Sequence, residues 1–184
     1  MDARIAPLEP PYEPDVDTIL RRMMGGTQIP PLRLFRVVAH NKAMLDKMRS
    51  TGSYLLNFGT LDPLEREIVI HRTCARCGAE YEWGVHVAVY GRALGLSAEQ
   101  VRSTVRGGPG DAVWSERQSL LMRLADELFE SNGLSDELWA ALRSEWSPEQ
   151  LVELVALAGQ YRMVSYLVNA FRVAPEEFAE LFPA

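Results

Sequence analysis

Residues 61–101 read LDPLEREIVIHRTCARCGAEYEWGVHVAVYGRALGLSAEQV and hold both cysteines and two of the three histidines of the chain. Asp62 followed by Pro63 is typical of a helix start, because Asp accepts hydrogen bonds from free backbone N–H groups and Pro needs none. Gly78 supplies a stop and a turn, and a second helix is expected over residues 80–94, ending at Gly95. This stretch therefore predicts two core helices that pack antiparallel around Gly78.

The chain beyond residue 96 carries regular signals for helix starts. Three serines are each followed three residues later by glutamine, which is the pattern of a capping box: Ser97, Ser115 and Ser147. Ser135 before Asp136-Glu137 marks a fourth start. The helix that follows Ser147 is nearly all apolar after its first turn, so we expect it to be buried in the core or against another subunit.

The N-terminal part is less regular. Residues 1–14 contain four prolines and are expected to form an irregular arm. Asp15 is expected to cap a short helix that ends at Gly25–Gly26, and residues 32–48 follow helical spacing loosely after the break at residues 29–31. β-Branched residues do not alternate with polar ones over any useful run. The sequence predicts one all-α domain of about eight helices over residues 15–184.

Composition limits the classes of function. The chain has 184 residues, a net charge of −6 and 47% hydrophobic residues, which suits an ordinary globular protein. Dispersed basic residues argue against nucleic acid as a partner. The start resembles no secretory signal and no run approaches ~18 uninterrupted apolar residues, so we expect no membrane span. Two cysteines three residues apart make a poor disulfide framework, which favours the cytoplasm.

Two glutamate–histidine pairs stand at helical spacing. Glu82 and His86 share one helix face, and Glu67 and His71 share another. If the two helices are antiparallel, Glu67 could approach His86, and a carboxylate beside an imidazole fixes its tautomer and raises its basicity. Tyr81 is a candidate hydrogen-bond donor to a developing enolate or carboxylate, and Trp83 a candidate apolar wall. Without further context, such pairs are more often solvated contacts on a helix surface.

The same residues carry a family resemblance. Glu65-Arg66-Glu67 at a helix start, Tyr81-Glu82-Trp83 followed by His86, and the ending ALGLS resemble the core of the carboxymuconolactone decarboxylase family, which includes the alkylhydroperoxidase D-like proteins. The resemblance covers residues 58–106. It implies an all-helical fold, homo-oligomers from dimers to hexamers, and a small-molecule substrate. It implies either acid–base catalysis without a cysteine pair, or peroxide reduction by a C-x-x-C pair with a histidine and an upstream glutamate.

The register of the cysteines separates these two chemistries. The peroxidase pattern places its cysteines seven and four residues before the histidine, at positions that hold Ala79 and Glu82 in this chain, whereas Cys74 and Cys77 each lie five residues upstream of these positions. They also fall at the C-terminal end of the first core helix, where the helix dipole raises a thiol pKa. They could be packed thiols, a redox dithiol or half of a zinc site, but zinc would need further ligands at recognisable spacing. No metal or cofactor is expected.

Three hypotheses follow from the sequence. The first is an acid–base enzyme acting on a small acidic or lactone-like metabolite, with His86 as general acid or base beside Glu67 and Glu82. The second is a thiol peroxidase that uses Cys74 and Cys77. The third is a non-catalytic helical module for assembly. His71 is expected to be structural, and Tyr161 is expected to be a core or subunit-contact aromatic.

Overall fold

The computed structural model describes residues 2–25 and 30–184, and these residues form nine α-helices, one π-helix and no strand. The all-α prediction is confirmed. In chain order the elements are α1 Pro14–Met23, α2 Arg33–Val38, α3 Lys42–Asn57, α4 Pro63–Arg76, α5 Glu80–His86, the π-helix η1 Val87–Gly91, α6 Ala98–Arg106, α7 Glu116–Ser131, α8 Asp136–Glu145 and α9 Pro148–Phe171.

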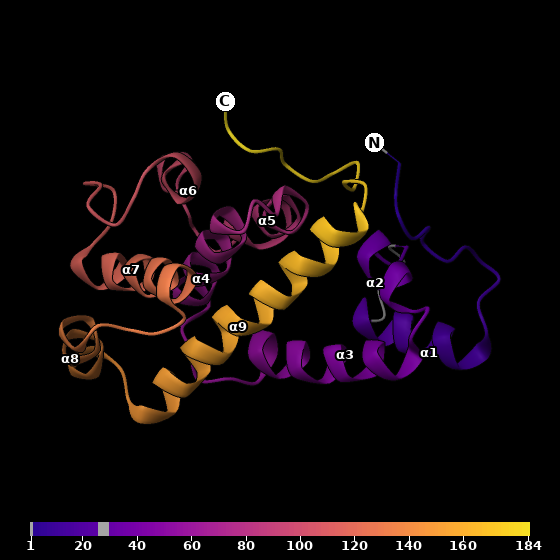
Figure 1. Cartoon of the computed structure of the whole chain (residues 1–184), viewed down its shortest axis with the longest axis horizontal. Helices are drawn as coiled ribbons and strands as arrows, with labels where there is room; N and C mark the ends of the chain where they lie inside the picture. Colours follow the sequence, from indigo (N-terminus) through magenta and orange to yellow (C-terminus); the bar gives the residue numbers. More distant parts are fainter. Residues whose placement is uncertain (1, 26–29) are drawn as a thin grey trace.

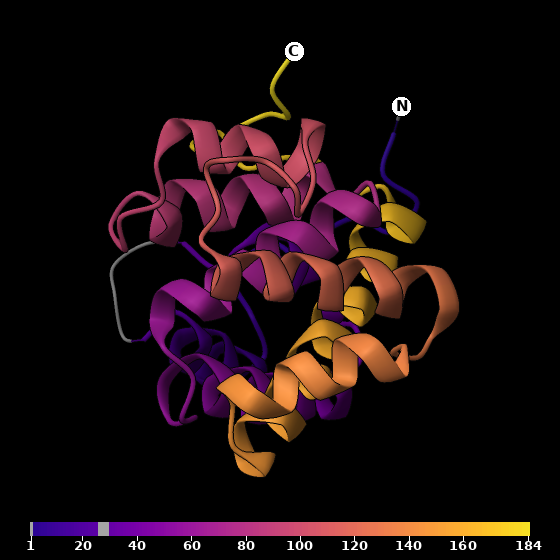
Figure 2. The same ribbon diagram turned by 90° about the vertical axis from the view of Figure 1, so that its left-hand side faces the viewer.

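Helix α4 is the centre of the molecule, since α5, α6, α7 and α9 all pack against it. Its residues Ile68, Val69 and Ile70 are fully buried. Helix α9 crosses the molecule diagonally, from α8 to the side where both termini lie (Figure 1). Figure 2 shows α7 and α8 stacked on one side of this frame. The two core helices predicted from residues 61–101 therefore have neighbours on every side.

Most helix starts lie where the capping signals place them. The side chains of Ser97, Ser115 and Ser147 accept hydrogen bonds from the backbone N–H of the glutamine three residues later, and each capping box is complete. Ser135 caps α8, and Asp62 accepts from the first turn of α4, where Pro63 is the first residue. These short-range rules hold because capping satisfies N–H groups that would otherwise lack partners.

Three sequence expectations need correction. Helix α1 begins at Pro14 with Glu13 as its N-cap residue, so Asp15 lies inside the first turn. The helical pattern over residues 32–48 is divided between α2 and α3, because the Asn41 side chain accepts from the N–H of Met44 and starts a new helix. The helix expected over residues 80–94 continues after α5 as the π-helix η1. The predicted signals at Gly26 and at residue 29 lie outside the described residues.

The C-terminal tail after α9 lies across α5. The backbone N–H of Glu180 donates to the carbonyl of Gly84 at 3.2 Å, and the N–H of Phe182 donates to the Glu80 carboxylate at 2.8 Å. The Phe182 ring packs edge-on against the indole of Trp83, with centroids 5.2 Å apart. The end of the chain is seen beside α5 in Figure 1 and beside α6 in Figure 2. The tail therefore covers the outer face of the helix that carries His86.

Replacing Gly84 with Val is expected to displace this tail. A Cβ at Gly84 would lie 1.9 Å from the carbonyl oxygen of Glu180, a distance that no side-chain motion can relieve because the neighbour is backbone. Limited proteolysis should then cleave the tail near Glu180 at least about tenfold faster than in the wild type, since cleavage tracks local opening. Gly159→Val is the matched control, because a Cβ there meets nothing within 4 Å. Equal cleavage rates in the two variants would contradict this account of the tail.

Helix α9 has the length and hydropathy of a membrane-spanning helix, with a mean hydropathy of 1.2 over its most apolar 18-residue window. Half of that window is buried inside the fold. Core helices of soluble proteins also pass this test of length and composition. Within the single chain one face of this helix is buried in the core, while Val152 is 71% exposed and Tyr166 is 56% exposed on the other side; the alternative of burial against another subunit stays a prediction.

Candidate functional site

The antiparallel packing of α4 and α5 brings Glu67 and His86 into direct contact. The Nδ1 atom of His86 lies 2.8 Å from Oε2 of Glu67, although 19 residues separate the two along the chain. The Glu67 side chain is fully buried, and that of His86 is 4% exposed. A charged group this deep in a protein needs a partner of opposite charge. The contact therefore points to an ion pair between a carboxylate and an imidazolium.

The surroundings favour the charged form of both groups. Burial alone would lower the pKa of His86, but the charge of Glu67 and hydrogen bonds to Glu67 and Glu82 outweigh it and raise the pKa to about 9. Burial alone would raise the pKa of Glu67, but the positive charge and hydrogen bond of His86, with help from His71 and Arg66, lower it overall. At neutral pH His86 is therefore protonated and Glu67 ionised.

Glu82 lies on the other side of the imidazole. Its Oε1 is 3.5 Å from Nε2 of His86, one helical turn away on α5. Its second oxygen, Oε2, is buried and has no hydrogen-bond partner within the described residues. A buried carboxylate oxygen costs free energy unless a hydrogen-bond donor, from the protein or from a bound molecule, bonds to it. The three side chains thus form the row Glu67–His86–Glu82, which is called the acid–base row below, with a free oxygen at its end.

His71 supports this row from α4 without joining it. Its Nδ1 lies 2.6 Å from the backbone carbonyl oxygen of Glu67, and its ring centroid is 6.3 Å from that of His86. Burial lowers the pKa of His71 to about 4, against the attraction of Glu67. The ring is therefore neutral at physiological pH and donates its Nδ1 proton to the carbonyl. A neutral ring bonded to the backbone is the arrangement expected of a structural residue, which is how the sequence analysis interpreted His71.

Two aromatic rings that sequence reasoning did not assign to the site enclose the imidazole. The ring of Tyr161 on α9 is edge-on to His86 at 5.0 Å, and the ring of Tyr90 in η1 lies over it at 5.1 Å. Burial raises the pKa of both phenols, and the charges of nearby glutamates raise it further. Tyr90 is four residues after His86 and was detectable by helical spacing, whereas nothing local marked Tyr161.

Tyr81 and Trp83 face away from the row. The Tyr81 hydroxyl donates to Glu176 of the C-terminal tail at 2.6 Å and accepts from the N–H of Leu34 at 3.1 Å. Trp83 donates its indole N–H to Thr104 at 3.0 Å and packs between His71 and Phe182. In this structure Tyr81 links the tail and the start of α2 to α5, and Trp83 packs in the core beside α6.

The two cysteines are free thiols at the C-terminal end of α4. Cys74 is fully buried and burial raises its pKa well above the ordinary value, with Glu82 adding to the shift. Cys77 is the C-cap residue, and burial raises its pKa too, against the opposing effects of Ser165 and two arginines. Both thiols are therefore protonated at neutral pH, which makes them poor nucleophiles. Cys74 lies near the row but presents no reactive thiolate.

Comparison with solved structures shows which proteins share this fold. The debrominase Bmp8, solved with 2,3,4-tribromopyrrole, has a TM-score of 0.80 at 14% identity, with 96% of this chain and 94% of that chain covered. A peroxidase-related protein from Silicibacter gives 0.78 at 18% identity, with 96% and 93% covered. A protein of unknown function from Agrobacterium tumefaciens, which has been compared with the antioxidant defence protein AhpD, gives 0.69 at 17% identity, with 76% of this chain and 94% of that chain covered. No protein-family model and no curated protein matches the sequence.

These neighbours have the alkylhydroperoxidase D-like, or carboxymuconolactone decarboxylase, fold. At identities of 14–18%, these matches show a shared fold but not a shared reaction, so the chemistry has to be argued from the residues of the site. The fold that residues 58–106 resembled is therefore the fold of this chain.

Proposed function

We propose that the protein is an enzyme that performs acid–base chemistry on a small acidic or lactone-like metabolite, through decarboxylation or a related lyase or isomerase step. The observation that carries this proposal is the buried acid–base row, in which an imidazolium is held between two carboxylates. Structural neighbours that include a debrominase and peroxidase-related proteins support the idea that this fold hosts catalysis. No metal or cofactor is needed for the steps below.

In the proposed reaction His86 is the general acid. Its Nδ1 proton is bound by Glu67, which leaves the Nε2 proton directed towards Glu82. In the proposal, the substrate carbon that receives this proton lies on the Glu82 side of the imidazole. When a substrate carboxylate leaves as CO₂, the C–C bond breaks and its electron pair passes into a conjugated carbonyl, forming an enolate. His86 transfers its Nε2 proton to the enolate carbon, directly or through Glu82, and solvent later restores that proton. The positive charge of His86 stabilises the developing negative charge before the transfer.

A thiol peroxidase is less well supported. Such an enzyme needs an accessible thiolate, whereas Cys74 is fully buried and the pKa of both thiols is raised. At the register where the peroxidase pattern has its second cysteine, this chain has Glu82. The carboxylate beside His86 can exchange protons but cannot form a disulfide. We therefore keep the peroxidase reaction as the competing function that the experiment below must exclude.

We further propose that the enzyme works as a homo-oligomer in the cytoplasm. Support comes from an exposed apolar patch where α3 meets α9: Phe58 is 73% exposed, Val152 71% and Tyr54 46%. The Tyr54 hydroxyl donates to Glu153, the neighbour of Val152 in the chain, so α3 and α9 meet at this point. Exposed apolar surface of this kind favours contact with another subunit.

The test is turnover by the wild-type protein of a panel of small carboxylated lactones and unsaturated carboxylic acids, followed by CO₂ release and ultraviolet absorbance. Because the acid form of His86 is lost as pH rises through about 9, kcat/KM should be level between about pH 7 and 8 and fall about tenfold per pH unit above 9. A rate that instead rises up to pH 9 would make His86 a base. No turnover of this panel, together with reduction of tert-butyl hydroperoxide that depends on Cys77, would reject the proposal for the thiol reaction.

A further inference from the structure

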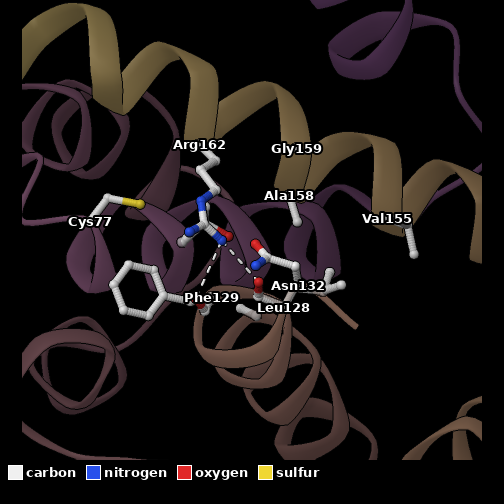
Figure 3. Close-up of a pocket in the computed structure, with 10 residues that line it drawn as sticks. Cys77, Leu128, Phe129, Asn132, Val155, Ala158, Gly159 and Arg162 are labelled. Atoms are coloured by element: carbon white, nitrogen blue, oxygen red, sulfur yellow. Dashed lines mark hydrogen bonds between the residues drawn. The ribbon is translucent and has the colours of Figure 1, made fainter. Parts of the chain in front are cut away.

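A pocket lies between α4, α7 and α9, and Figure 3 shows the side chains that line it. Its volume is about 180 Å³, and its lining is mostly apolar, including Leu128, Phe129, Val155 and Ala158. Thr73 and Cys77 of α4 also line it, whereas the acid–base row reaches α4 at Glu67. Glu67, Glu82 and His86 are not among the residues that line the pocket.

Arg162 supplies the charge of this pocket. It extends from α9 towards the end of α7, where its Nη1 donates to the carbonyls of Leu128 and Phe129 at 2.9 and 3.3 Å (Figure 3). Its Nε donates to the Tyr166 hydroxyl at 2.7 Å, and its guanidinium lies 5.2 Å from the centre of the Phe129 ring. All these contacts are to uncharged groups: across residues 2–25 and 30–184, no carboxylate pairs with Arg162. A partly buried guanidinium without a counter-ion attracts an anion.

Gly159 keeps the pocket open. It lies in the middle of α9, where glycine is less favourable for the helix than alanine. Packing does not require glycine, because a Cβ at this position would meet nothing within 4 Å. A longer side chain would instead extend over the pocket that Gly159 lines. The glycine thus weakens the helix while leaving this space free.

We propose that this pocket binds a small monocarboxylate with a flat, apolar body. The carboxylate would pair with Arg162, and the body would lie against Phe129 and the aliphatic side chains. A cavity of about 150 Å³ accommodates a benzene ring, so the pocket suits a molecule with one ring or a short conjugated chain. The proposal is independent of the chemistry at His86.

Benzoate is the probe, and benzyl alcohol is the uncharged molecule of similar shape, both titrated into the full chain by NMR and calorimetry. Benzoate should bind saturably, with chemical-shift changes at Arg162 and Phe129. Gly159→Leu should weaken binding at least about tenfold by filling the pocket, and Gly159→Ala should keep it within about threefold. Arg162→Gln should weaken benzoate about 10- to 100-fold, the range for a lost hydrogen bond to a charged group, and leave benzyl alcohol nearly unchanged.

Three outcomes would overturn the proposal. The first is the absence of saturable benzoate binding below about 20 mM, which by affinity arithmetic is weaker than about −2.3 kcal/mol. The second is equal binding by the Gly159→Leu and Gly159→Ala variants. The third is a changed oligomeric state of Gly159→Leu alone in light scattering, which would assign the pocket to a contact between subunits. Unchanged benzoate affinity in His86→Asn would keep this inference separate from the proposed catalytic function.

Discussion

Replacing Glu67 with Gln is expected to lower the free energy of unfolding by about 3–5 kcal/mol at pH 7, the cost of removing one partner of a buried ion pair. The substitution changes the charge but barely the shape of the side chain. His86, at 4% side-chain exposure, must then stay charged without its counter-ion or give up its proton. Chemical denaturation monitored by circular dichroism measures the loss. A titration of the His86 ring by NMR should show its pKa falling from about 9 to below its ordinary value.

The control is Glu130→Gln, which also removes a carboxylate from an ion pair. The Glu130 side chain is 62% exposed and pairs with Arg76, so its loss should cost at most about 1 kcal/mol. If the free energy of unfolding falls by a similar amount in the Glu67 and Glu130 variants, burial does not determine how much the Glu67–His86 pair contributes to stability.

The same ion pair predicts how stability depends on pH. The pKa of His86 is about 9 in the folded protein against 6.5 in the unfolded chain. The stabilisation from its charge is therefore complete below about pH 6.5, declines as pH rises, and is gone above about pH 9. His71, whose pKa is about 4 in the fold against 6.5 in the unfolded chain, acts in the opposite direction: it lowers stability as pH falls through about 6.5, so the decline due to His86 is to be followed above about pH 7.5. In Glu67→Gln the decline should disappear.

Replacing His86 with Asn is expected to reduce kcat/KM by about 10²- to 10⁴-fold on whichever member of the lactone and acid panel is turned over, the contribution of a positioned general acid. Asn keeps a donor near Glu67 but offers no titrating proton. His40→Asn is the matched control, because His40 is exposed and bonds only to the Ala6 carbonyl at the surface. Circular dichroism should establish that both variants are folded before rates are compared. A His86 variant with wild-type kcat/KM would remove the acid–base row from the mechanism.

The local rules of sequence accounted for much of the fold because they act within one helical turn. The caps at Ser97, Ser115, Ser135 and Ser147 each depend on residues that are two or three positions apart. The meeting of Glu67 and His86 was predictable for a related reason: one turn at Gly78, with a φ of +62°, joins their two helices.

Other parts of the site depend on contacts between distant segments. Tyr161 reaches His86 from α9, and the partners of Tyr81 are Leu34 and Glu176, so the hydrogen bonds of Tyr81 depend on where α2 and the tail pack. The spacing of residues within 79–86 cannot predict these contacts with distant segments. For the same reason the spacing of Cys74 and Cys77 suggested a redox pair, whereas their burial and raised pKa depend on α9 and on the end of α4.

The π-helix η1 has a consequence for comparing this chain with its structural neighbours. A π-turn holds one residue more than an α-turn over the same span, and such turns arise where a single residue is inserted into a helix. Alignments that assume a continuous α-helix after His86 would therefore be out of register by one position from Val87–Gly91 onwards. In such an alignment Tyr90, whose ring lies over the imidazole, would be paired with a residue that is not its structural equivalent. Structure-based alignment with a one-residue gap in this segment is the appropriate way to look for Tyr90 in other proteins of this fold.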